Sequence, residues 1–413
     1  MILFCISASL LAWNLAGYPI LLFVIANRKK DFVQFRKKTI RDVSVLVAAH
    51  NEETCIKERV ENLKANGSWR NVEIIVVSDG STDKTAELAE KAGAHVIEKE
   101  RAGKISALYK AISESKGEAL VVTDANTIFL PGAIDLLVDP LEDTRVGITA
   151  GDLILENDDE TASSRGESIY WKYETWIKRN ASNAGLLLMG AGGIYAVRKE
   201  NWPMNIPADT ADDSYVPLSL HKNGFMNIFV PEARAKERAG TLMKEEWNRR
   251  IRMVAQDTKV AVALSFGLPN KKTFFALVSQ KVLRWLILPL AVIFLITSRD
   301  AAKKLERMKG IIRLAHLPLK AALPITGAII MAGAIAERRG KKISGVSVAF
   351  YFFGAATAAF AGLIFGMLGK SNAIWNKADS TRKTNGVNLN LLQQHNGLPH
   401  SHPLLKEEAT NGY

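Results

Sequence analysis

The chain has 413 residues, a net charge of +12 and 48% hydrophobic residues. Cys5 and Cys55 are its only cysteines, which excludes a disulfide framework and a cysteine-based metal site. The excess positive charge lies beside apolar segments, so we attribute it to attraction for membrane lipids and expect no nucleic acid partner.

The first 27 residues are apolar and nearly uncharged, and a basic run that begins at Arg28 follows them. A cleaved signal peptide places its positive charge first and ends in small residues. The opposite order here predicts a retained N-terminal transmembrane anchor at residues 1–27. Because basic flanks tend to stay inside, we expect the domain that follows to be cytoplasmic.

From Val43 to about Leu155, short apolar runs alternate with helical patterns, which predicts an α/β fold with a parallel sheet wrapped by helices. The expected strands are 43–48, 72–77, 94–97 and 119–123, and the expected helices are 54–65, 104–114 and one ending at Gly93. Ser81 or Thr82 is expected to cap that last helix. The whole soluble domain is expected to span residues 40–265.

A second apolar region covers residues 274–369, with candidate segments at 274–298, 315–336 and 344–369. Only the last is long and uncharged enough to predict a span directly. The first contains Lys281 and Arg284, so we expect it to lie in the membrane interface or to re-enter. This arrangement suits the positive-inside tendency and predicts a multi-pass protein of the cell membrane. The polar residues 371–413 are expected to be disordered.

Polar or acidic residues directly follow three expected strands: His50-Asn51-Glu52, Asp79, and Asp124-Ala125-Asn126. Ligands of such sheets bind beyond the carboxyl ends of the strands, so these residues favour a binding site. The sequence has neither a glycine-rich dinucleotide motif nor a P-loop after the first strand. Asp124 and Asn126 can supply the oxygen ligands that Mg²⁺ or Mn²⁺ prefers beside a phosphate.

Three segments, Ala48 to Glu53, Ser78 to Asp83 and Arg101 to Leu108, carry a resemblance to a known family. They resemble glycosyltransferase family 2, whose nucleotide-binding domain has the GT-A (Rossmann-like) fold. The resemblance covers roughly residues 43–264 and extends to synthases of the cellulose, chitin and hyaluronan type. It implies a membrane-anchored, metal-dependent hexosyltransferase that uses a nucleotide sugar, preferably a UDP-sugar.

The resemblance also assigns roles to individual residues. The implied nucleotide-sugar-binding residues are Ala48, His50, Asn51, Glu52, Asp79, Gly80, Lys104, Asp124, Arg249 and Arg252. The implied metal ligands are Asp124 and Asn126, although the family usually has aspartate at the second position. Asp213 is the implied catalytic base, with Asp212 beside it. Two adjacent carboxylates repel each other's charge, and burial raises one pKa toward the working pH.

Further segments resemble the acceptor side of the family. Residues 249–253 stand where processive synthases have Gln-x-x-Arg-Trp, and only Arg252 is retained in register. Met253 replaces the tryptophan on which the acceptor stacks, so processivity stays open. Trp171, Glu174 and residues 190–195 are also expected on this side, although aromatic residues at such spacing are as often part of a core.

Family members with these residues transfer the sugar with inversion, so the resemblance implies the same route here, in which Asp213 removes the proton of an acceptor hydroxyl. The favoured acceptor is a growing membrane-associated polysaccharide, which would involve export partner proteins. The alternatives are a single transfer to a lipid-linked polyprenyl phosphate, a non-catalytic scaffold for a partner synthase and, more remotely, a nucleotidyltransferase. Asn126 and the altered segment 249–253 motivate the scaffold alternative.

Overall fold

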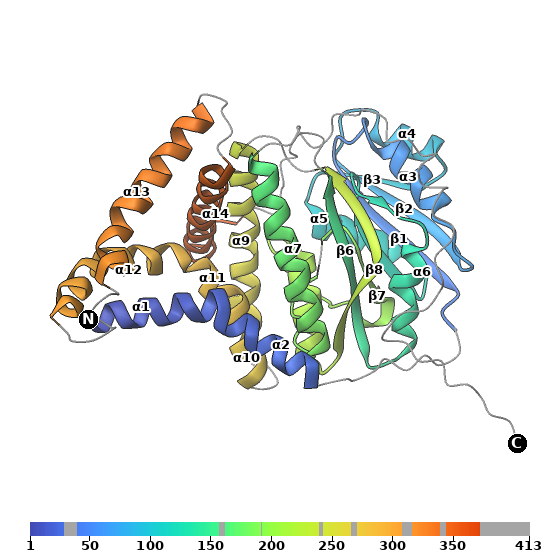
Figure 1. Cartoon of the computed structure of the whole chain (residues 1–413). Coiled ribbons are helices and arrows are strands. Elements are labelled where there is room, and N and C mark those ends of the chain that lie inside the picture. Colours follow the sequence, from blue (N-terminus) through green and yellow to red (C-terminus); the bar gives the residue numbers. More distant parts are fainter. Residues whose placement is uncertain are drawn as a thin grey trace, which may run out of the picture.

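The computed structural model describes residues 1–28, 39–156, 162–190, 192–238, 243–265, 271–307, 316–338 and 344–371. A twisted sheet with its covering helices lies at one end of the molecule, and the apolar helices lie at the other (Figure 1). The long helices α7 (Ala162–Asn183) and α9 (Met243–Ser265) lie between the two parts. The predicted disordered tail lies outside the described residues, apart from Ser371.

The described strands form one mixed sheet in the order β3-β2-β1-β4-β7-β6-β8-β5. Their bounds are β1 (Asp42–Ala49), β2 (Asn71–Asp79), β3 (His95–Lys99), β4 (Ala119–Asp124), β5 (Ile128–Phe129), β6 (Val146–Glu156), β7 (Tyr195–Arg198) and β8 (Met226–Arg238). Strands β3, β2, β1 and β4 are parallel, as predicted. The prediction of a parallel sheet is wrong beyond β4, because β7 runs antiparallel to both β4 and β6.

Helices cover both faces of the sheet, which agrees with the predicted α/β class. They are α3 (Ile56–Ala65), α4 (Thr85–Lys91), α5 (Lys104–Glu114), α6 (Ala133–Val138) and α8 (Asp212–Lys222), with short 3₁₀ turns at Asp139–Glu142 and Lys199–Asn201. Alternate residues of β1 enter two cores. Val45 and Val47 pack toward α3 and α6, whereas Leu46 and Ala48 pack toward α5 and α8. This burial on both faces explains why the strands read as continuous apolar runs.

The predicted cap of α4 is wrong. The helix begins at Thr85 after Lys84, and Asp83 accepts the Thr85 N–H at 3.0 Å. Ser81 instead accepts the backbone N–H of Asn51 at 3.2 Å, and the Asn51 side chain accepts the Thr82 N–H at 2.8 Å. Ser81 and Thr82 therefore hydrogen-bond to the turn after β1 and do not cap α4.

The N-terminal segment consists of α1 (Ile2–Ala12), a π-helical turn η1 (Trp13–Gly17) and α2 (Tyr18–Arg28). Its length and apolar composition suffice to cross a membrane. However, α2 also joins the core of the soluble domain, since Tyr18, Leu22 and Ala26 are buried there. The predicted anchor is thus partly a structural element of that domain.

The C-terminal region contains α10 (Lys271–Leu277), a second π-helical turn η4 (Val278–Val282), α11 (Leu283–Trp285), α12 (Ile287–Glu306), α13 (His316–Arg338) and α14 (Ser344–Met367). The chain bends by 65° between the helical stretches 271–285 and 287–306, so the first predicted segment does not run straight. Within the described part, three stretches could cross a membrane, at Ile2–Arg28, His316–Ala336 and Val348–Met367, or four if the bent pair counts as one span.

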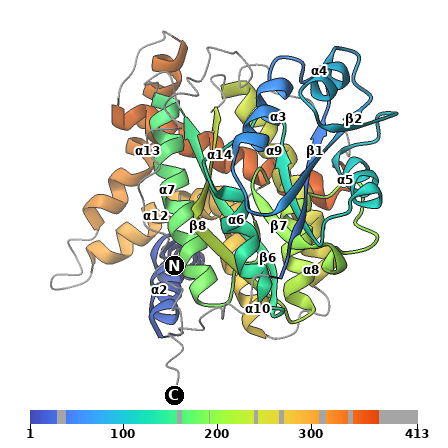
Figure 2. The ribbon, with the colours of Figure 1, turned by 90° about the vertical axis from the view of Figure 1, so that its right-hand side faces the viewer.

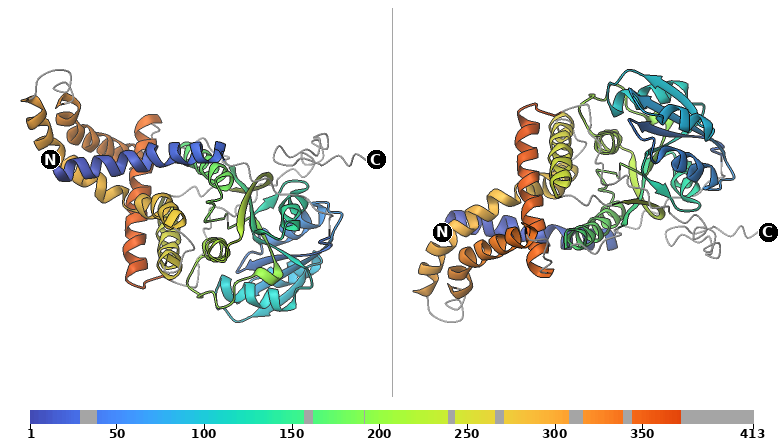
Figure 3. Two further views of the ribbon diagram at one scale, coloured as in Figure 1. Left: turned by 90° about the horizontal axis from the view of Figure 1, so that it is seen from below. Right: turned by 90° about the horizontal axis from the view of Figure 1, so that it is seen from above.

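The apolar helices pack on one side of the sheet domain only. Figure 2 shows α12 and α13 on the side opposite to β1 and β2. In both views of Figure 3, α14 lies along α9, and Gly362 and Gly366 of α14 closely approach the backbone carbonyls of Ile251 and Ala255. This close approach joins the helix that carries the predicted arginines to a candidate membrane span.

Candidate active site

A cavity of about 1310 Å³ runs from the carboxyl ends of β1 and β4 to the apolar helices. Its wall contains many of the predicted site residues: Ala48, Glu52, Lys104, Asp124, Asn126, Asp212, Asp213, Arg249 and Arg252. The predicted residues His50, Asn51, Asp79 and Gly80 lie next to this edge of the sheet but not on the cavity wall. The structure therefore brings acids and arginines from the second half of the chain to the carboxyl ends of β1 and β4, which belong to the first half.

Lys104 joins two carboxylates at the sheet end of the cavity. Ala48 of β1 lies opposite Asp124 of β4, and α5 begins with Lys104 nearby. The Lys104 Nζ lies 2.9 Å from Asp124 Oδ1 and 3.3 Å from Asp212 Oδ1. Burial alone would lower the pKa of Lys104, but Asp124, Asp212 and Asp213 outweigh it and raise the pKa above its ordinary value. Lys104 therefore stays charged and partly neutralises a cluster of acids.

The Asp79 carboxylate is fully buried and holds the loop after β3. It accepts hydrogen bonds from the backbone N–H groups of Ala102 at 2.9 Å and Gly103 at 2.8 Å, and from Lys99 Nζ at 2.9 Å. Its backbone carbonyl accepts a hydrogen bond from His50 Nδ1 at 2.9 Å. In this conformation both side chains shape the edge of the sheet without lining the cavity.

Gly80 and Asn51 both adopt positive φ angles in the turns where they lie. Gly80 has a φ of +67°, and a Cβ there would lie 2.6 Å from the Cβ of Arg101. Asn51 has a φ of +55°, a conformation that asparagine tolerates better than most residues. The motif residues that follow β1 and β2 are thus needed for the local backbone structure of the two turns.

Two adjacent carboxylates begin α8 and face the cavity. Asp212 is 4% exposed and accepts a hydrogen bond from the Tyr195 hydroxyl at 2.7 Å. Gly192 lies against Asp213, because a Cβ there would come within 3.1 Å of Asp213 Oδ2. The backbone N–H of Gly190 donates to the Asp213 carbonyl at 2.8 Å. These contacts fix the start of α8 against the glycine-rich segment that precedes β7.

Burial, followed by the neighbouring charges of Asp212 and Asp257, raises the pKa of Asp213 from 3.8 to about 7 against the opposing effect of Lys104 and Lys281. A carboxyl group with a pKa near neutrality can both accept and release a proton at physiological pH. Asp213 therefore has the property that a general base requires.

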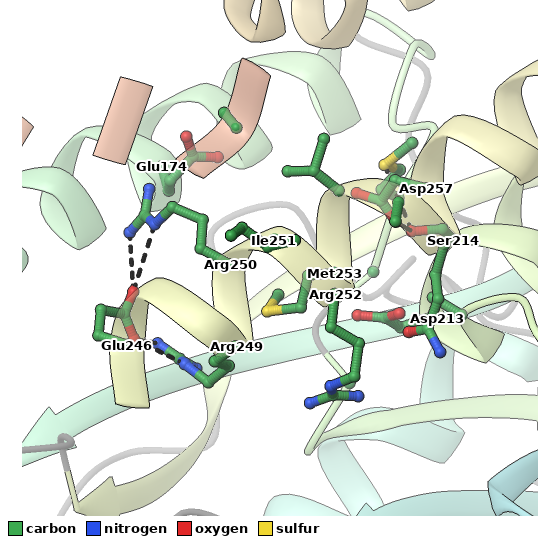
Figure 4. A pocket seen from close by; sticks show the side chains of 18 of the residues that line it. Glu174, Asp213, Ser214, Glu246, Arg249, Arg250, Ile251, Arg252, Met253 and Asp257 are labelled. Carbon is green, nitrogen blue, oxygen red and sulfur yellow. Dashed lines mark hydrogen bonds and ion pairs between the residues drawn. The ribbon is translucent and has the colours of Figure 1, made fainter. Parts of the chain in front are cut away.

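The arginines of α9 divide into two groups, as Figure 4 shows. Arg249 and Arg250 both pair with Glu246, at 2.7 Å and 3.0 Å. Arg252 extends on the side of Asp213, and it makes no ion pair within the described part of the chain. Burial lowers the pKa of Arg252, followed by the repulsion of Arg249. Arg252 is thus the arginine that is available to an anion in the cavity.

The side-chain oxygen atoms near Asp124 supply only some of the ligands that a hard cation needs. No group of three or more histidine, cysteine, aspartate or glutamate residues in the described ranges could hold a metal by itself. Asn126 Nδ2 donates to Glu237 Oε1 at 3.0 Å, and both residues line the cavity with Asp124. A Mg²⁺ or Mn²⁺ ion commonly completes its shell with phosphate oxygens and water. The donor set therefore fits a cation that arrives with a diphosphate.

Several wall residues were missed by sequence reasoning because their partners are distant in the chain. Glu237 lies on β8, and no motif marks it. Asp257 on α9 accepts a hydrogen bond from the Ser214 hydroxyl at 2.6 Å and lies 3.7 Å from Lys281. Lys178 on α7 also lines the cavity. Asp257 and Lys178 could have been indicated by one signal only, namely a polar residue on the buried face of an amphipathic helix.

Glu174, predicted on the acceptor side, lines the cavity and forms an ion pair with Arg284. Burial would raise the pKa of Glu174, but the charges of Arg284, Lys281 and Lys178 lower it to about 2. Trp171 lines the same end of the cavity. This ion pair links α7 to α11, next to the bend that precedes α12.

Comparisons with known proteins agree with this geometry. Residues 44–202 match the family model described as Glycosyl transferase family 2. The poly-beta-1,6-N-acetyl-D-glucosamine synthase of Staphylococcus aureus is 24% identical over 258 residues, which are 60% of this chain and 61% of the relative. An N-acetylglucosaminyltransferase of Neorhizobium galegae is 25% identical over 283 residues, covering 60% of this chain and 64% of the relative. The chain thus spans less than two thirds of the length of these relatives.

Among solved structures, the mannosyltransferase PcManGT from Pyrobaculum calidifontis, in complex with GDP-Man and Mn²⁺, has a TM-score of 0.64 and is 21% identical. The match covers 89% of this chain and 100% of that one, so the two share a fold that includes helices beyond the sheet. The predicted GT-A-like α/β fold is therefore confirmed. Residues 44–202 resemble glycosyltransferase family 2, as the sequence motifs predicted.

Proposed function

We propose that the protein is an inverting glycosyltransferase that moves a sugar from a nucleotide sugar to a hydroxyl group of a membrane-associated saccharide. The observation that carries the proposal is one cavity in which the Asp213 carboxyl, with a pKa of about 7, faces the same space as Lys104, Asp124 and Arg252. This combination provides a proton acceptor and several charges suited to a diphosphate.

The diphosphate of the donor would lie at the sheet end of the cavity. Asp124, with Asn126, would hold Mg²⁺ or Mn²⁺, and the cation, when bound, offsets the negative charge that develops on the leaving diphosphate. Lys104 and Arg252 would hydrogen-bond to the diphosphate oxygens and stabilise the same charge. Glu52 and Ala48, at the end of β1, would border the nucleoside.

Asp213 would act on the acceptor. The acceptor oxygen forms a bond to the anomeric carbon from the face opposite the diphosphate, while the bond between that carbon and the diphosphate oxygen breaks. The hydroxyl proton passes to the Asp213 carboxylate, and the nucleoside diphosphate leaves with the bonding electron pair. Because attack and departure occur on opposite faces, the product has the inverted anomeric configuration.

We favour a polysaccharide as the acceptor, with a UDP-sugar as the donor. The S. aureus relative is named a synthase of a polymer of N-acetylglucosamine, and it matches 60% of this chain. The cavity also extends to Phe352 and Phe365 of α14, a candidate membrane span, so its far end adjoins the region where a membrane-associated acceptor would lie. The basic residue Arg28 and the run that follows support a cytoplasmic position for the domain.

The test uses the purified full chain in lipid nanodiscs with UDP-N-acetylglucosamine, UDP-glucose and GDP-mannose, each with Mn²⁺ or with a chelator. We expect nucleotide release with at least one UDP-sugar, an inverted anomer by NMR, and a product whose size rises with time. Asp213→Asn should abolish transfer, whereas Glu200→Gln, at a residue outside the cavity wall, should not. Near-normal transfer by Asp213→Asn would refute the assigned base. If no donor released its nucleotide, a non-catalytic role would replace this proposal.

A further inference from the structure

The end of the cavity nearest the apolar helices contains a second group of polar residues. We call this group the acceptor-end cluster and define it as Asn14, Lys178, Lys281 and Arg284. Its members come from three widely separated parts of the chain: η1, α7, and the consecutive elements η4 and α11. The cluster does not include Lys104 and Arg252, to which the donor diphosphate is assigned above.

Among the cations of this cluster, Lys178 is the one that forms no ion pair with a described residue. Arg284 pairs with Glu174, and Lys281 lies 3.7 Å from Asp257. Lys178 makes no ion pair with any residue that the structure describes, and its Nζ lies 5.4 Å from the centre of the Trp171 ring. Four acids lie near these cations. Glu174 and Asp257 are paired as stated, Asp152 accepts a hydrogen bond from Thr175 at 2.9 Å, and Asp213 is the acid assigned above as the base.

Burial lowers the pKa of Lys178, and the attraction of Glu174 and Asp152 does not fully offset this effect. A partly buried ammonium group that lacks a counter-ion is costly, because the charge has lost part of its hydration. An anion in the cavity would remove this cost. The position of Lys178 therefore favours a ligand that carries negative charge.

Asn14 is the second, independent observation. Its side chain is 5% exposed and lines the cavity, and its Nδ2 is buried without a hydrogen-bond partner in the described structure. Buried polar groups are nearly always paired in native proteins, so an unpaired amide in a cavity indicates a missing acceptor. An oxygen-rich ligand would satisfy Asn14 and Lys178 together.

The backbone around Asn14 is also unusual. Asn14 lies in the π-helical turn η1, and η1 packs against the other π-helical turn, η4. Trp13 Nε1 donates to the Ser279 hydroxyl at 3.2 Å, and Gln280 Nε2 donates to the Tyr18 hydroxyl at 2.6 Å. Such turns are rare and frequently occur at functional sites. Here they fix Asn14 at the cavity wall.

The wall beside the cluster is apolar. Its residues come from candidate membrane helices and from the start of α12: Leu15, Ile287, Phe352, Ala355, Ala356 and Ala359. A saccharide alone would leave this wall without a suitable partner, because sugar hydroxyls lose hydrogen bonds to water there. A hydrocarbon chain would bury it favourably.

From this combination we propose that the acceptor-end cluster binds the phosphate of a lipid-linked saccharide, and that this molecule is the acceptor to which the first sugar of the polysaccharide is added. The phosphate contacts Lys178 and Asn14, and the hydrocarbon chain lies along α14. The saccharide extends toward Asp213, which is near enough for its charge to influence Lys178. The inference rests on the proposed transfer function and specifies its acceptor class.

The first test measures binding to the full chain in nanodiscs without a nucleotide sugar, so it does not depend on transfer. The three probes are farnesyl-phosphate-linked N-acetylglucosamine, the same farnesyl glycoside without phosphate, and water-soluble N-acetylglucosamine 1-phosphate. We expect the phosphate-bearing lipid to bind about 10-fold to 100-fold more tightly than the neutral lipid. Equal affinities would overturn the proposal. Equal binding of the water-soluble phosphate would overturn its lipid part.

The second test uses variants on a single helix. Lys178→Met should remove the preference for the phosphate-bearing lipid, and Lys178→Arg should retain most of it. Lys172→Met is the matched control, because Lys172 is an exposed lysine of α7 outside the cavity wall. A preference that survives in Lys178→Met, or an equal loss in Lys172→Met, would contradict the inference. A protein that prefers the phosphate lipid but transfers no sugar would contradict the proposed function alone.

Discussion

The protonation of Asp213 gives the sharpest prediction. If Asp213 is the base, only its carboxylate form is active, and burial raises its pKa to about 7. At pH 8 about nine tenths of the molecules would carry the carboxylate, and at pH 6 about one tenth. The value of kcat/KM should therefore fall by about 10-fold from pH 8 to pH 6. Initial rates of nucleotide release, measured in buffers of constant ionic strength, would show this.

Asp212 provides a way to shift the profile. Its negative charge is one of the causes that raise the pKa of Asp213, so Asp212→Asn should lower that pKa. The acidic limb of the pH profile should then move to lower pH, even if the maximal rate falls because the hydrogen bond from Tyr195 weakens. Asp213→Asn should lose about 10² to 10⁴ in rate and keep no acidic limb near pH 7.

The same shift predicts the sign of a stability change. The folded-state pKa of Asp213 lies above its ordinary value of 3.8, so folding favours the protonated form. This contribution to stability is complete below about pH 3.8 and is lost as the pH rises through about 7. At pH 8, Asp213→Asn should therefore unfold at a higher temperature than the wild type. A flat rate profile from pH 6 to pH 8, together with an unchanged unfolding temperature, would refute this account of Asp213.

Three further predictions concern the cavity wall. Lys104→Met should raise the KM for the nucleotide sugar by about 10-fold or more, because it removes a charged contact to the diphosphate, and steady-state kinetics would separate this from an effect on kcat. The double variant Asn126→Asp with Glu237→Gln should bind Mn²⁺ more tightly than the wild type in an EPR titration, since a carboxylate replaces an amide beside Asp124. Glu174→Gln should lower the free energy of unfolding by about 3 kcal/mol in chemical denaturation, because it removes the buried carboxylate that pairs with Arg284.

The sheet end of the site could be predicted because its signals are local. The apolar runs of β1 and β4 each end at a polar residue, and Lys104 begins α5 at the predicted position. Parallel neighbours bring their carboxyl ends to one edge, so Asp124 could be expected near the end of β1 without a structure. The mixed half of the sheet could not be predicted in this way, because β7 has only four residues and its direction depends on its partners.

The other end of the cavity depends on contacts between residues far apart in the chain. Glu174 and Arg284 are 110 positions apart, and Asn126 and Glu237 are 111 positions apart. No periodic pattern encodes such a pairing, since each residue alone resembles an ordinary polar residue of a helix or strand. Asp79 is a further example. Its carboxylate binds backbone N–H groups in the loop after β3, and no side-chain pattern in the sequence marks such partners.

The burial of Tyr18 and Leu22 in the core of the soluble domain has a practical consequence. If the N-terminal segment were only a membrane tether, its removal would release a domain that keeps its activity. Here, deletion of residues 1–28 would expose the faces of α7 that α2 covers, and it would also remove the wall that Asn14 contributes. Because a candidate membrane span also packs against the catalytic fold, its insertion into a bilayer would set the height and tilt of the cavity above the lipid surface.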